Sequence, residues 1–425
     1  MRREGGPLSF NSIKGFKDIL PEEVGYWQRL ESAARRIYTA YGFQEIKTPV
    51  LEWTELFSRG IGEETDIVSK EMYTLTDSKG RGMTMRPEAT ASVVRAYIQH
   101  RLYGKNPIRK LFSIGPMFRH EQPQLGRFRQ FHQINAEIFG DPGPRSDAEI
   151  IAMAMQLFET IGLGDLCLNI NALGCPECRP RFRDELRAFL QDKADGLCAD
   201  CLRRRQTNPL RVFDCKVDGC KGVIADAPSI PDYLCGDCDG HFGEVQALLN
   251  HLNISYMINH KLVRGLDYYN RTTFEIRTER LGAQNAVAGG GRYDGLVKLL
   301  GGPDHPAIGF AVGMERLVAL LQESGGPGAE RSGLYIAALG EDAEKAAFQW
   351  AFQLRKSGLG VDMSYQSKSL KAQMKQADRL QAAHVLIVGD NEMASGVGLL
   401  RDMDTKEQSE LSLKDCVARL TELLG

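Results

Sequence analysis

Apolar and polar residues alternate along the segment LFSIGPMFRHEQPQLGRFRQFHQINAEIF, which runs from Leu111 to Phe139. Side chains of a β-strand point alternately to its two faces. On the second limb, one face carries Phe131, Gln133, Asn135 and Glu137, and the other carries Ile134, Ala136 and Ile138. The pattern predicts a β-hairpin with one buried apolar face. Its mixed polar face is costly unless it meets solvent or a ligand, so it indicates either an exposed sheet face with ion pairs or a binding surface.

Further elements follow from the same periodicities. Helices are predicted at residues 21–41, from Pro21 to the glycine at 42, and at residues 148–162. FQEIKTPVLE predicts a strand whose Pro49 indicates an edge, a bulge or an interface, and MYTLTDSKGRGMTM predicts a hairpin. LVRGLDYYNRTTFEIR and AVAGGGRYDGLV predict strands joined by a short loop, and AIGFAVGMERLVALL predicts a strand that passes into a helix.

Three regions emerge along the chain of 425 residues, which is too long for one ordinary core. The glycine-rich stretch ESGGPGAERSG predicts a linker at 326–332 between a main region, 1–325, and a tail, 333–425. Strands and helices alternate in the tail, which predicts a small α/β domain. Within the main region, residues 175–241 contain eight of the ten cysteines and are interpreted as an inserted module.

The net charge of −2 excludes a general attraction to nucleic acid, so a polyanion must be bound by local basic patches. No apolar run reaches membrane-spanning length, and Arg2 and Arg3 are not followed by an apolar stretch. A cytoplasmic protein without a membrane partner is therefore expected. Cysteines in a reducing cytosol favour metal over disulfides.

The cysteines of the module come in closely spaced pairs. Cys175 and Cys178 are followed nineteen residues later by Cys198 and Cys201, a spacing within the zinc-ribbon range. These four are expected to form a zinc site. Cys215, Cys220, Cys235 and Cys238 form a second candidate set. An iron–sulfur cluster and unligated thiols remain alternatives, since zinc and such clusters both use four thiolates.

Four arginines lie in separate stretches of the chain, each near glycine or aromatic residues: Arg119, Arg127, Arg264 and Arg316. Guanidinium groups bind phosphate through two hydrogen bonds and keep their charge. Glycines at 289–291 allow a ligand to approach the backbone closely. Four arginines that converge would indicate a polyphosphate.

These segments carry a specific resemblance. RHEQPQLGRFRQF resembles motif 2 of the class II aminoacyl-tRNA synthetases, GFAVGMERL resembles their motif 3, and GFQEIKTPVLE resembles motif 1. LVRGLDYYNRTTFE and AGGGRYDGL resemble two peptides of the histidyl-tRNA synthetases, and the likeness covers nearly the whole chain. It implies an α+β catalytic domain with an antiparallel sheet, the inserted module, a C-terminal α/β anticodon-binding domain and a homodimer built through motif 1.

The resemblance implies an ATP-dependent ligase that forms histidyl-adenylate and pyrophosphate and then transfers histidine to its tRNA, with Mg²⁺ assisting. Arg119 would hold the α-phosphate and the substrate carboxylate, and Arg264 would assist the transition state across the same phosphate. Arg127 and Arg316 would hold the outer phosphates, while Glu121 and Phe131 would bind adenine. The histidine pocket would comprise Glu88, Ala89, Thr90, Arg119, Gln133, Glu137, Arg264, Tyr268 and Tyr269.

Several points stay open on the sequence. A regulatory subunit of ATP phosphoribosyltransferase, a non-catalytic paralogue, is the alternative, and Arg264 in an intact LVRGLDYY disfavours it. Gln122 and Leu125 stand where relatives often carry basic residues, so the contacts with the tRNA acceptor end are not predicted. Basic residues at helical spacing in the tail indicate a solvated face or a phosphate contact: Lys368, Lys371, Lys375 and Arg379. The module is expected to support tRNA charging rather than activation, because its cysteines are separated from every substrate motif.

Overall fold

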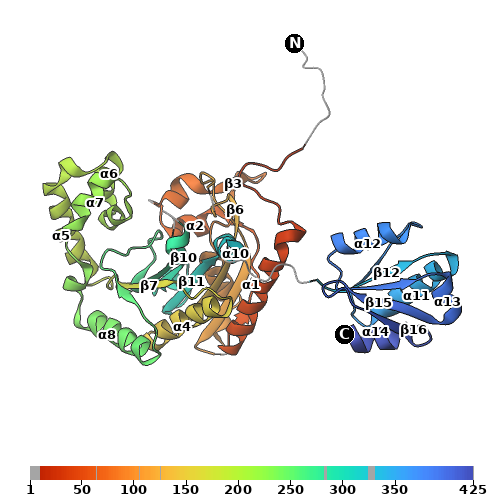
Figure 1. The fold of residues 1–425 in the computed structure, drawn as a ribbon. Coiled ribbons are helices and arrows are strands. Elements are labelled where there is room, and N and C mark those ends of the chain that lie inside the picture. Colours follow the sequence, from red (N-terminus) through yellow and green to blue (C-terminus); the bar gives the residue numbers. More distant parts are fainter. Residues whose placement is uncertain are drawn as a thin grey trace, which may run out of the picture. The chain divides into compact units, whose positions relative to one another are not determined.

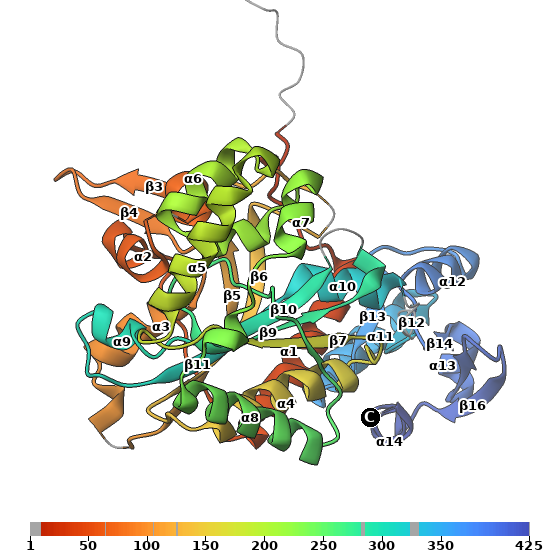
Figure 2. The ribbon, with the colours of Figure 1, turned by 90° about the vertical axis from the view of Figure 1, so that its left-hand side faces the viewer.

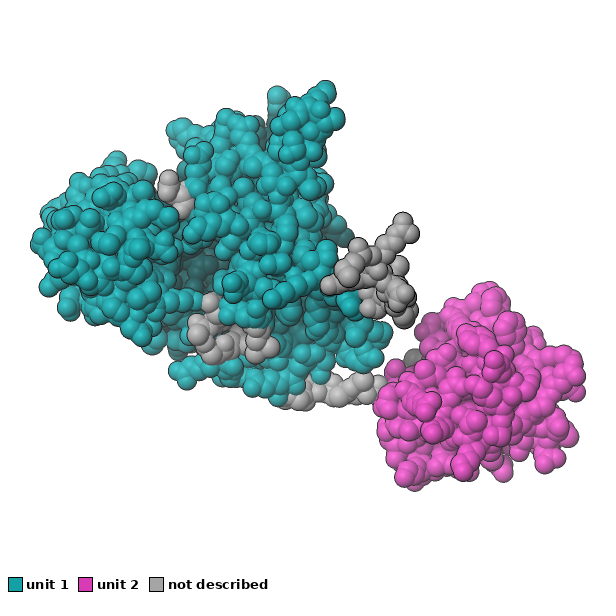
Figure 3. Space-filling view, turned by 90° about the horizontal axis from the view of Figure 1, so that it is seen from above, with its two compact units in different colours: residues 1–324 teal, residues 325–425 magenta. Residues whose placement is uncertain are grey.

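The computed structural model describes residues 10–63, 65–104, 106–124, 126–281, 285–323 and 331–424. The chain forms two compact units, residues 1–324 and 325–425, which Figure 3 shows in two colours. Each unit is described by itself below. The linker predicted at 326–332 lies largely outside the described residues.

An eight-stranded sheet forms the centre of the first unit (Figures 1 and 2). Its order is β1-β5-β6-β11-β10-β9-β7-β8, and every neighbouring pair is antiparallel except β1–β5 and β7–β8. The strands are β1 (Gln44–Glu45), β5 (Arg109–Phe118), β6 (Gln130–Phe139), β7 (Cys167–Ala172), β8 (Met257–Ile258), β9 (Asn270–Arg277), β10 (Ala286–Arg292) and β11 (Ala307–Gly313). This antiparallel sheet with helices confirms the predicted fold class.

The predicted hairpin is the pair β5–β6, with Ile114 opposite Ile134. Ile134, Ala136 and Ile138 are buried, and helices pack over them on one face of the sheet. The main helices of this layer are α1 (Pro21–Ala40), α4 (Pro144–Thr160), α8 (Gly236–His251) and α10 (Met314–Glu323). Helices α4 and α8 run side by side over this face (Figures 1 and 2). The other face of β6 is therefore left for the polar residues.

A small sheet of order β2-β4-β3 lies beside the main one. It contains β2 (Leu51–Trp53), β3 (Tyr73–Thr76) and β4 (Gly82–Met85), and the nearby helices are α2 (Thr54–Ile61), η1 (Ile67–Glu71), α3 (Thr90–Gln99) and η2 (Leu102–Gly104). The strand predicted over FQEIKTPVLE is wrong as one element. It is divided into β1 and β2, in different sheets, with Pro49 between them, because proline has no N–H for a ladder.

A second prediction also needs correction: LVRGLDYY is not a strand, and β9 begins only at Asn270. The preceding residues form a loop whose backbone groups make hydrogen bonds outside the sheet. The N–H of Asp267 donates to Ile61 O at 3.1 Å, and Arg211 donates to the carbonyls of Arg264 and Gly265. A short helix, α9 (Leu296–Leu299), follows β10 as the chain leaves the glycine run.

The cysteine-rich region is helical. Its elements are α5 (Arg179–Asp192), η3 (Ala194–Gly196), α6 (Ala199–Thr207), η4 (Pro209–Asp214), α7 (Asp218–Ala225), η5 (Ile230–Tyr233) and the start of α8. Helices α5, α6 and α7 gather together at one side of the unit (Figure 1). Buried residues such as Phe182 and Leu186 belong to the same apolar cluster as Tyr97, Tyr269 and Tyr293 of the main region. The module is thus packed against the main region.

The second unit confirms the predicted α/β domain. Its sheet has the order β13-β12-β14-β15-β16, parallel across the first three strands and antiparallel afterwards. The elements are β12 (Leu334–Ala338), α11 (Glu341–Lys356), β13 (Val361–Met363), α12 (Leu370–Arg379), β14 (His384–Val388), α13 (Asp390–Ser395), β15 (Val397–Asp402), β16 (Gln408–Ser412) and α14 (Cys416–Leu424). None of the described helices in either unit is both long and apolar enough to cross a membrane.

Candidate active site and cysteine clusters

A cleft of about 640 Å³ opens beside the polar face of the main sheet. All four arginines singled out in the sequence line it, together with Glu88, Thr90, Glu121, Phe131, Gln133, Tyr268 and Tyr269. The cleft size lies within the range of ligand sites in proteins. Residues from five separate stretches of chain therefore meet in one place.

Arg264 lies across the floor of the cleft. Its Nη1 donates to Glu275 at 2.8 Å, and its guanidinium stands 5.9 Å from the ring centre of Tyr269. A methyl group on Gly289 of β10 would come within 2.2 Å of Nη2, so only glycine leaves room for this side chain. The buried Nε has no hydrogen-bond partner within the described part of the chain. A buried donor without a partner indicates a place for a ligand acceptor.

Arg119, Arg127 and Glu121 form a linked group at the rim. Nε of Arg127 lies 2.6 Å from a Glu121 carboxylate oxygen, and Nη1 of Arg119 lies 3.7 Å from the other. Arg119 also donates through Nε to Pro87 O at 2.8 Å and stands 5.2 Å from the ring centre of Phe131. The Glu121 carboxylate therefore forms ion pairs with both arginines. A ligand anion that paired with Arg119 or Arg127 would release the Glu121 carboxylate from that ion pair.

Arg316 lies in the first turn of α10, which begins at Met314 directly after β11. Its Nη1 donates to Ala286 O. Burial, followed by the positive charge of Arg127, lowers the pKa of Arg316. The helix N-terminus adds further positive potential. Arginines that lower one another's pKa in this way indicate a site that attracts an anionic ligand.

Two buried carboxylates lie at the cleft: Glu88 lines it, and Glu137 is hydrogen-bonded to the lining residue Thr90 without lining the cleft itself. Glu88 accepts hydrogen bonds from the N–H groups of Thr90 and Ala91 at 2.8 and 2.7 Å, where α3 begins. Glu137 accepts from Thr90 Oγ1 at 2.7 Å and from the hydroxyl of Tyr293. Burial raises the pKa of both groups, and that of Glu137 to about 8.

The remaining pocket residues surround these carboxylates. The Tyr268 hydroxyl donates to Glu88 at 3.4 Å, and the rings of Tyr268 and Tyr269 lie 4.7 Å apart. Ala89 is buried immediately before α3. The buried Oε1 of Gln133 has no hydrogen-bond partner among the described residues. A pocket of acids, an amide and hydroxyls suits a small ligand that carries N–H donors.

Sequence reasoning missed three residues that shape the site. Tyr293 follows the glycine run and bonds to Glu137, and Glu275 of β9 holds Arg264. Gly309 of β11 is required because a Cβ there would stand 1.6 Å from a Glu137 oxygen. The need for glycine at position 309 follows from the strand pairing, because Gly309 lies opposite Glu137. That pairing is not visible in the sequence.

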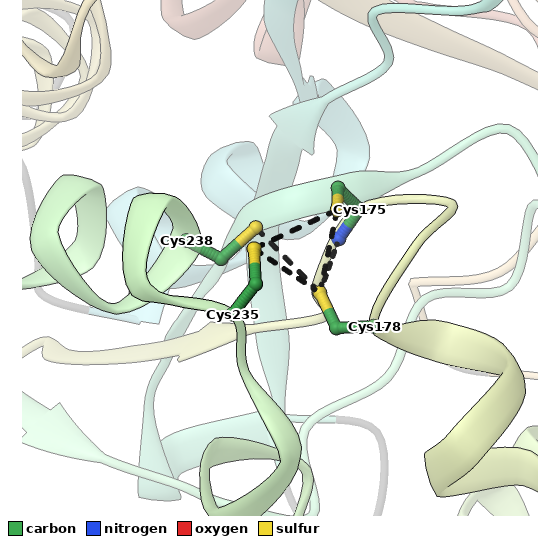
Figure 4. Close-up of side chains that lie close together, drawn as sticks. All are labelled: Cys175, Cys178, Cys235 and Cys238. Atoms are coloured by element: carbon green, nitrogen blue, oxygen red, sulfur yellow. Dashed lines mark hydrogen bonds between the residues drawn. The ribbon is translucent and has the colours of Figure 1, made fainter.

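The expected grouping of the cysteines is wrong. Cys175 and Cys178 meet Cys235 and Cys238, not Cys198 and Cys201 (Figure 4). We call these four the proximal cluster, because they lie where the module leaves β7 and returns through α8. The remaining four form the distal cluster: Cys198, Cys201, Cys215 and Cys220. Nested pairing follows because the two ends of an insertion lie close together on its host domain.

Both clusters have the dimensions of a single tetrahedral ion. Within each, the four sulfurs lie within 4.8 Å of one another. Sulfur–sulfur distances are 3.4 to 3.9 Å in the proximal cluster, and the distance between the sulfurs of Cys198 and Cys215 is 3.8 Å. Bonds of about 2.3 Å to a tetrahedral zinc place sulfurs roughly 3.8 Å apart. Disulfide sulfurs would be only about 2 Å apart.

The structure also corrects the expected separation of the module from the substrate motifs. Phe213, Asp214, Cys215 and Lys216 line the same cleft as the arginines. Arg211 of η4 donates to the carbonyls of Arg264 and Gly265, at 3.3 and 2.6 Å. Desolvation in the cleft, followed by the charges of Arg127 and Arg316, lowers the pKa of Lys216. Part of the module is thus a wall of the site.

Two other predictions concern the periphery. Gln122 is exposed, and Leu125 lies outside the described residues. The basic residues at 368, 371, 375 and 379 are all exposed, while Gln373 and Ala377 face the core of the second unit. Gln373 donates to Ala338 O at 2.6 Å and fixes the rotation of α12. The face carrying these basic residues is therefore open to a partner.

A sheet of this topology, with arginines from several stretches around one cleft, defines the catalytic domain of a class II aminoacyl-tRNA synthetase. Comparisons with known proteins identify the family. The family model for histidyl-tRNA synthetase matches residues 15–317, and that for an anticodon binding domain matches residues 334–423. Histidine–tRNA ligases of Desulfatibacillum aliphaticivorans and Desulfosudis oleivorans are 56% and 57% identical over 97% of this chain, covering 99% and 98% of those proteins.

Solved structures agree. The apo histidyl-tRNA synthetase of S. aureus matches with a TM-score of 0.82 and 35% identity, covering 97% of this chain and 100% of that one. The chain belongs to the histidyl-tRNA synthetase family, and its function is that of an ATP-dependent histidine–tRNA ligase. A structure described as an ATP phosphoribosyltransferase regulatory subunit/histidyl-tRNA synthetase is 19% identical and shares the fold alone. The non-catalytic alternative is therefore rejected.

Proposed function

We propose that this cleft forms histidyl-adenylate and then transfers histidine to the 3′ end of the tRNA, with each residue in the role given below. The observation that carries the proposal is the convergence of four arginines on a cleft that is also lined by the buried carboxylate of Glu88, with Glu137 hydrogen-bonded to the lining residue Thr90. In the first step, the histidine carboxylate attacks the α-phosphate of ATP, and pyrophosphate leaves. The tRNA ribose hydroxyl then takes the histidyl group, and AMP leaves.

Positioning and charge neutralisation carry the first step, as in other phosphoryl chemistry. Arg119 and Arg264 hold the α-phosphate between them, and Arg119 also holds the substrate carboxylate. The unpartnered Nε of Arg264 supports this role. Arg127 and Arg316 hold the outer phosphates, together with Mg²⁺, which neutralises the charge of the triphosphate when bound. Glu121 accepts from the adenine amino group, and Phe131 stacks on the base.

Glu88 and Glu137 select histidine. Both are buried, and hydrogen bonds from Thr90, Ala91 and Tyr293 hold them in place. An imidazole N–H satisfies such an acid, whereas an amino acid without one leaves it unpaired, at a cost of about 1–3 kcal/mol or more. Gln133, Tyr268 and Tyr269 complete the walls.

Histidine-dependent exchange of pyrophosphate into ATP tests the proposal directly. The purified protein should catalyse exchange with histidine and much less with histidinol or phenylalanine, which lack the carboxylate and the imidazole respectively. Absence of exchange with well-folded protein would overturn the proposed roles of the cleft.

Each cysteine cluster is proposed to hold one zinc ion. The sulfur spacing supports a single ion, because a cluster of several irons would hold its thiolates further apart. The Cys175 N–H donates to the sulfur of Cys178, and the Cys198 N–H donates to the sulfur of Cys220, both at 3.1 Å. Such hydrogen bonds stabilise the thiolate form that binds zinc. Bound zinc supplies structural cross-links and no chemistry of the reaction.

Two further assignments concern the assembly. Leu51, Trp53 and Leu75 of the small sheet are 42%, 47% and 53% exposed, although they are large and apolar. We assign this surface to a homodimer contact, which sedimentation analysis would detect as twice the chain mass. Ten free cysteines suit a reducing compartment, which supports a cytoplasmic location. The second unit is assigned to the anticodon arm of the tRNA.

A further inference from the structure

We propose that the inserted module supplies a fifth cation to the nucleotide site: Lys216 contacts the outer phosphates of ATP and the pyrophosphate product, and the distal cluster holds it there through Cys215. The inference rests on the proposed placement of ATP, in which Arg127 and Arg316 hold the same phosphates. It gives one of the two cysteine clusters a direct part in substrate binding.

The position of Lys216 is set by η4. Arg211 of this element bonds to the carbonyls of Arg264 and Gly265 and lies 3.7 Å from an Asp267 oxygen. These contacts tie η4 to the loop that carries Arg264. Because η4 ends at Asp214, the next residues project along the cleft, and Phe213, Asp214, Cys215 and Lys216 all line it.

The distal cluster fixes the segment from the other side. The Cys215 sulfur lies 3.8 Å from that of Cys198, and the Cys215 N–H donates to Val212 O at 3.0 Å. Cys215 thus belongs to the cluster and to the cleft wall together. A zinc ion at the cluster would hold the backbone next to Lys216 within a narrow range of positions. Without it, the segment after η4 would lose a cross-link to the rest of the distal cluster, although the Arg211 contacts and the buried Val212 would still hold η4 itself.

Charge identifies the ligand. The Lys216 ammonium has no hydrogen bond or ion pair within the described part of the chain, and it shares the cleft wall with Arg127, Arg316 and Arg119. The carboxylates of Asp214 and Glu121 also act on this exposed lysine, but neither forms an ion pair with it, so its ammonium can contact an anion that enters the cleft beside Arg127 and Arg316. The triphosphate tail of ATP is such an anion, and a lysine on a flexible stem binds phosphate as a point charge.

The decisive experiment compares Lys216→Ala with Lys221→Ala. Lys221 lies in α7 of the same module, but it pairs with Asp218 at 2.8 Å and does not line the cleft. We expect Lys216→Ala to raise the KM for ATP in the exchange assay, and the Kd for pyrophosphate by calorimetry, about fivefold to tenfold. Lys216→Arg should restore most of the affinity, and Lys221→Ala should change neither value.

Three results would overturn the inference. Equal ATP and pyrophosphate affinities for the two alanine variants would remove the phosphate contact. A raised KM for tRNA alone, with normal exchange, would assign Lys216 to RNA instead. If Cys215→Ser protein loses one zinc but keeps its affinity for pyrophosphate, the distal cluster does not hold Lys216 in place. Arg316→Ala distinguishes failure of this inference from failure of the proposed function. If Arg316→Ala weakens ATP binding and Lys216→Ala does not, only the inference about Lys216 is wrong. If neither substitution weakens ATP binding, the proposed phosphate site is wrong.

Discussion

The guanidinium of Arg264 lies directly against Gly289, so that a methyl group at position 289 would stand 2.2 Å from its Nη2. The glycine run in AVAGGGRYDG therefore makes room for an arginine of the same chain. Gly290 is equally crowded, since a Cβ there would stand 2.2 Å from Gly309 O. Close approach of strand and side chain is what requires glycine here.

Replacement of Arg264 by alanine should reduce adenylate formation by on the order of a hundredfold or more, because one preorganised charge is lost at the transition state. Pyrophosphate exchange measures the rate. The fold and the proposed homodimer should persist, since the main chain of this loop is held by Arg211 and Ile61. Circular dichroism and sedimentation check both, and near wild-type exchange would show that another arginine carries the role.

Gly289→Ala should also impair exchange, by about tenfold or more, although it removes no functional group. Its added methyl displaces the Arg264 guanidinium, and a small misplacement of a catalytic group is costly. Gly295→Ala is the matched control, because nothing lies within 4 Å of a Cβ at that position. Equal activities for the two variants would mean that Arg264 can adopt another productive position.

Much of this site was accessible from the sequence, because β-strand alternation is a local rule. The polar face of 130–139 was assigned from its period alone, and Ile134, Ala136 and Ile138 do enter the apolar core, although Asn135 and Glu137 of the polar face are buried as well. The convergence of Arg119 and Arg264 came instead from resemblance, since no local pattern tells which distant stretches of chain meet. Tyr293 was missed for the same reason: its partner Glu137 lies on another strand.

The cysteines show the limit most clearly. Spacing along the chain groups neighbours, which led to Cys175 and Cys178 being paired with Cys198 and Cys201. In the fold, the helices of the module place α8 beside the end of β7, so the first and last pairs meet. Pro49 gives a milder case. The sequence indicated an edge, a bulge or an interface at this residue, but not that the two halves would join different sheets.

The pH dependence of stability should reveal Glu137. Its pKa is raised by burial to about 8, from an ordinary value of 4.5. Between these values the folded protein keeps a proton that the unfolded chain releases. The free energy of unfolding should therefore fall as pH rises through this window, by up to about 1.4 kcal/mol per pH unit from this group.

Glu137→Gln cannot ionise and should flatten this dependence. Thermal midpoints of the ligand-free wild type and the variant, compared between about pH 5.5 and pH 8.5, measure the difference. The wild type should lose more stability toward the alkaline end. Parallel curves would mean that Glu137 is already ionised in the folded pocket at neutral pH.

Zinc content should distinguish the two possible groupings of the cysteines. Protein purified without chelator should contain two zinc ions per chain. A pair of substitutions within the proximal cluster, Cys175→Ser with Cys238→Ser, should remove one of them. A pair divided between clusters, Cys175→Ser with Cys201→Ser, should remove both. Grouping by sequence neighbours requires the opposite outcome, so elemental analysis of these two variants decides between them.

The exposed basic face of α12 should contribute to tRNA binding through phosphate contacts. Lys371 and Lys375 project from the side of the helix opposite Gln373 and Ala377, which face the core of the second unit. Lys371→Ala with Lys375→Ala should raise the KM for tRNA and reduce the salt dependence of binding by about one unit of slope per lysine. Pyrophosphate exchange should not change, because the reaction cleft is formed by the first unit.

Lys345→Ala with Lys356→Ala on α11 is the matched control, since it removes the same charge from another helix of the second unit whose lysines are exposed. An equal effect of both pairs would indicate a general electrostatic attraction, and no effect of either would place the RNA contact elsewhere.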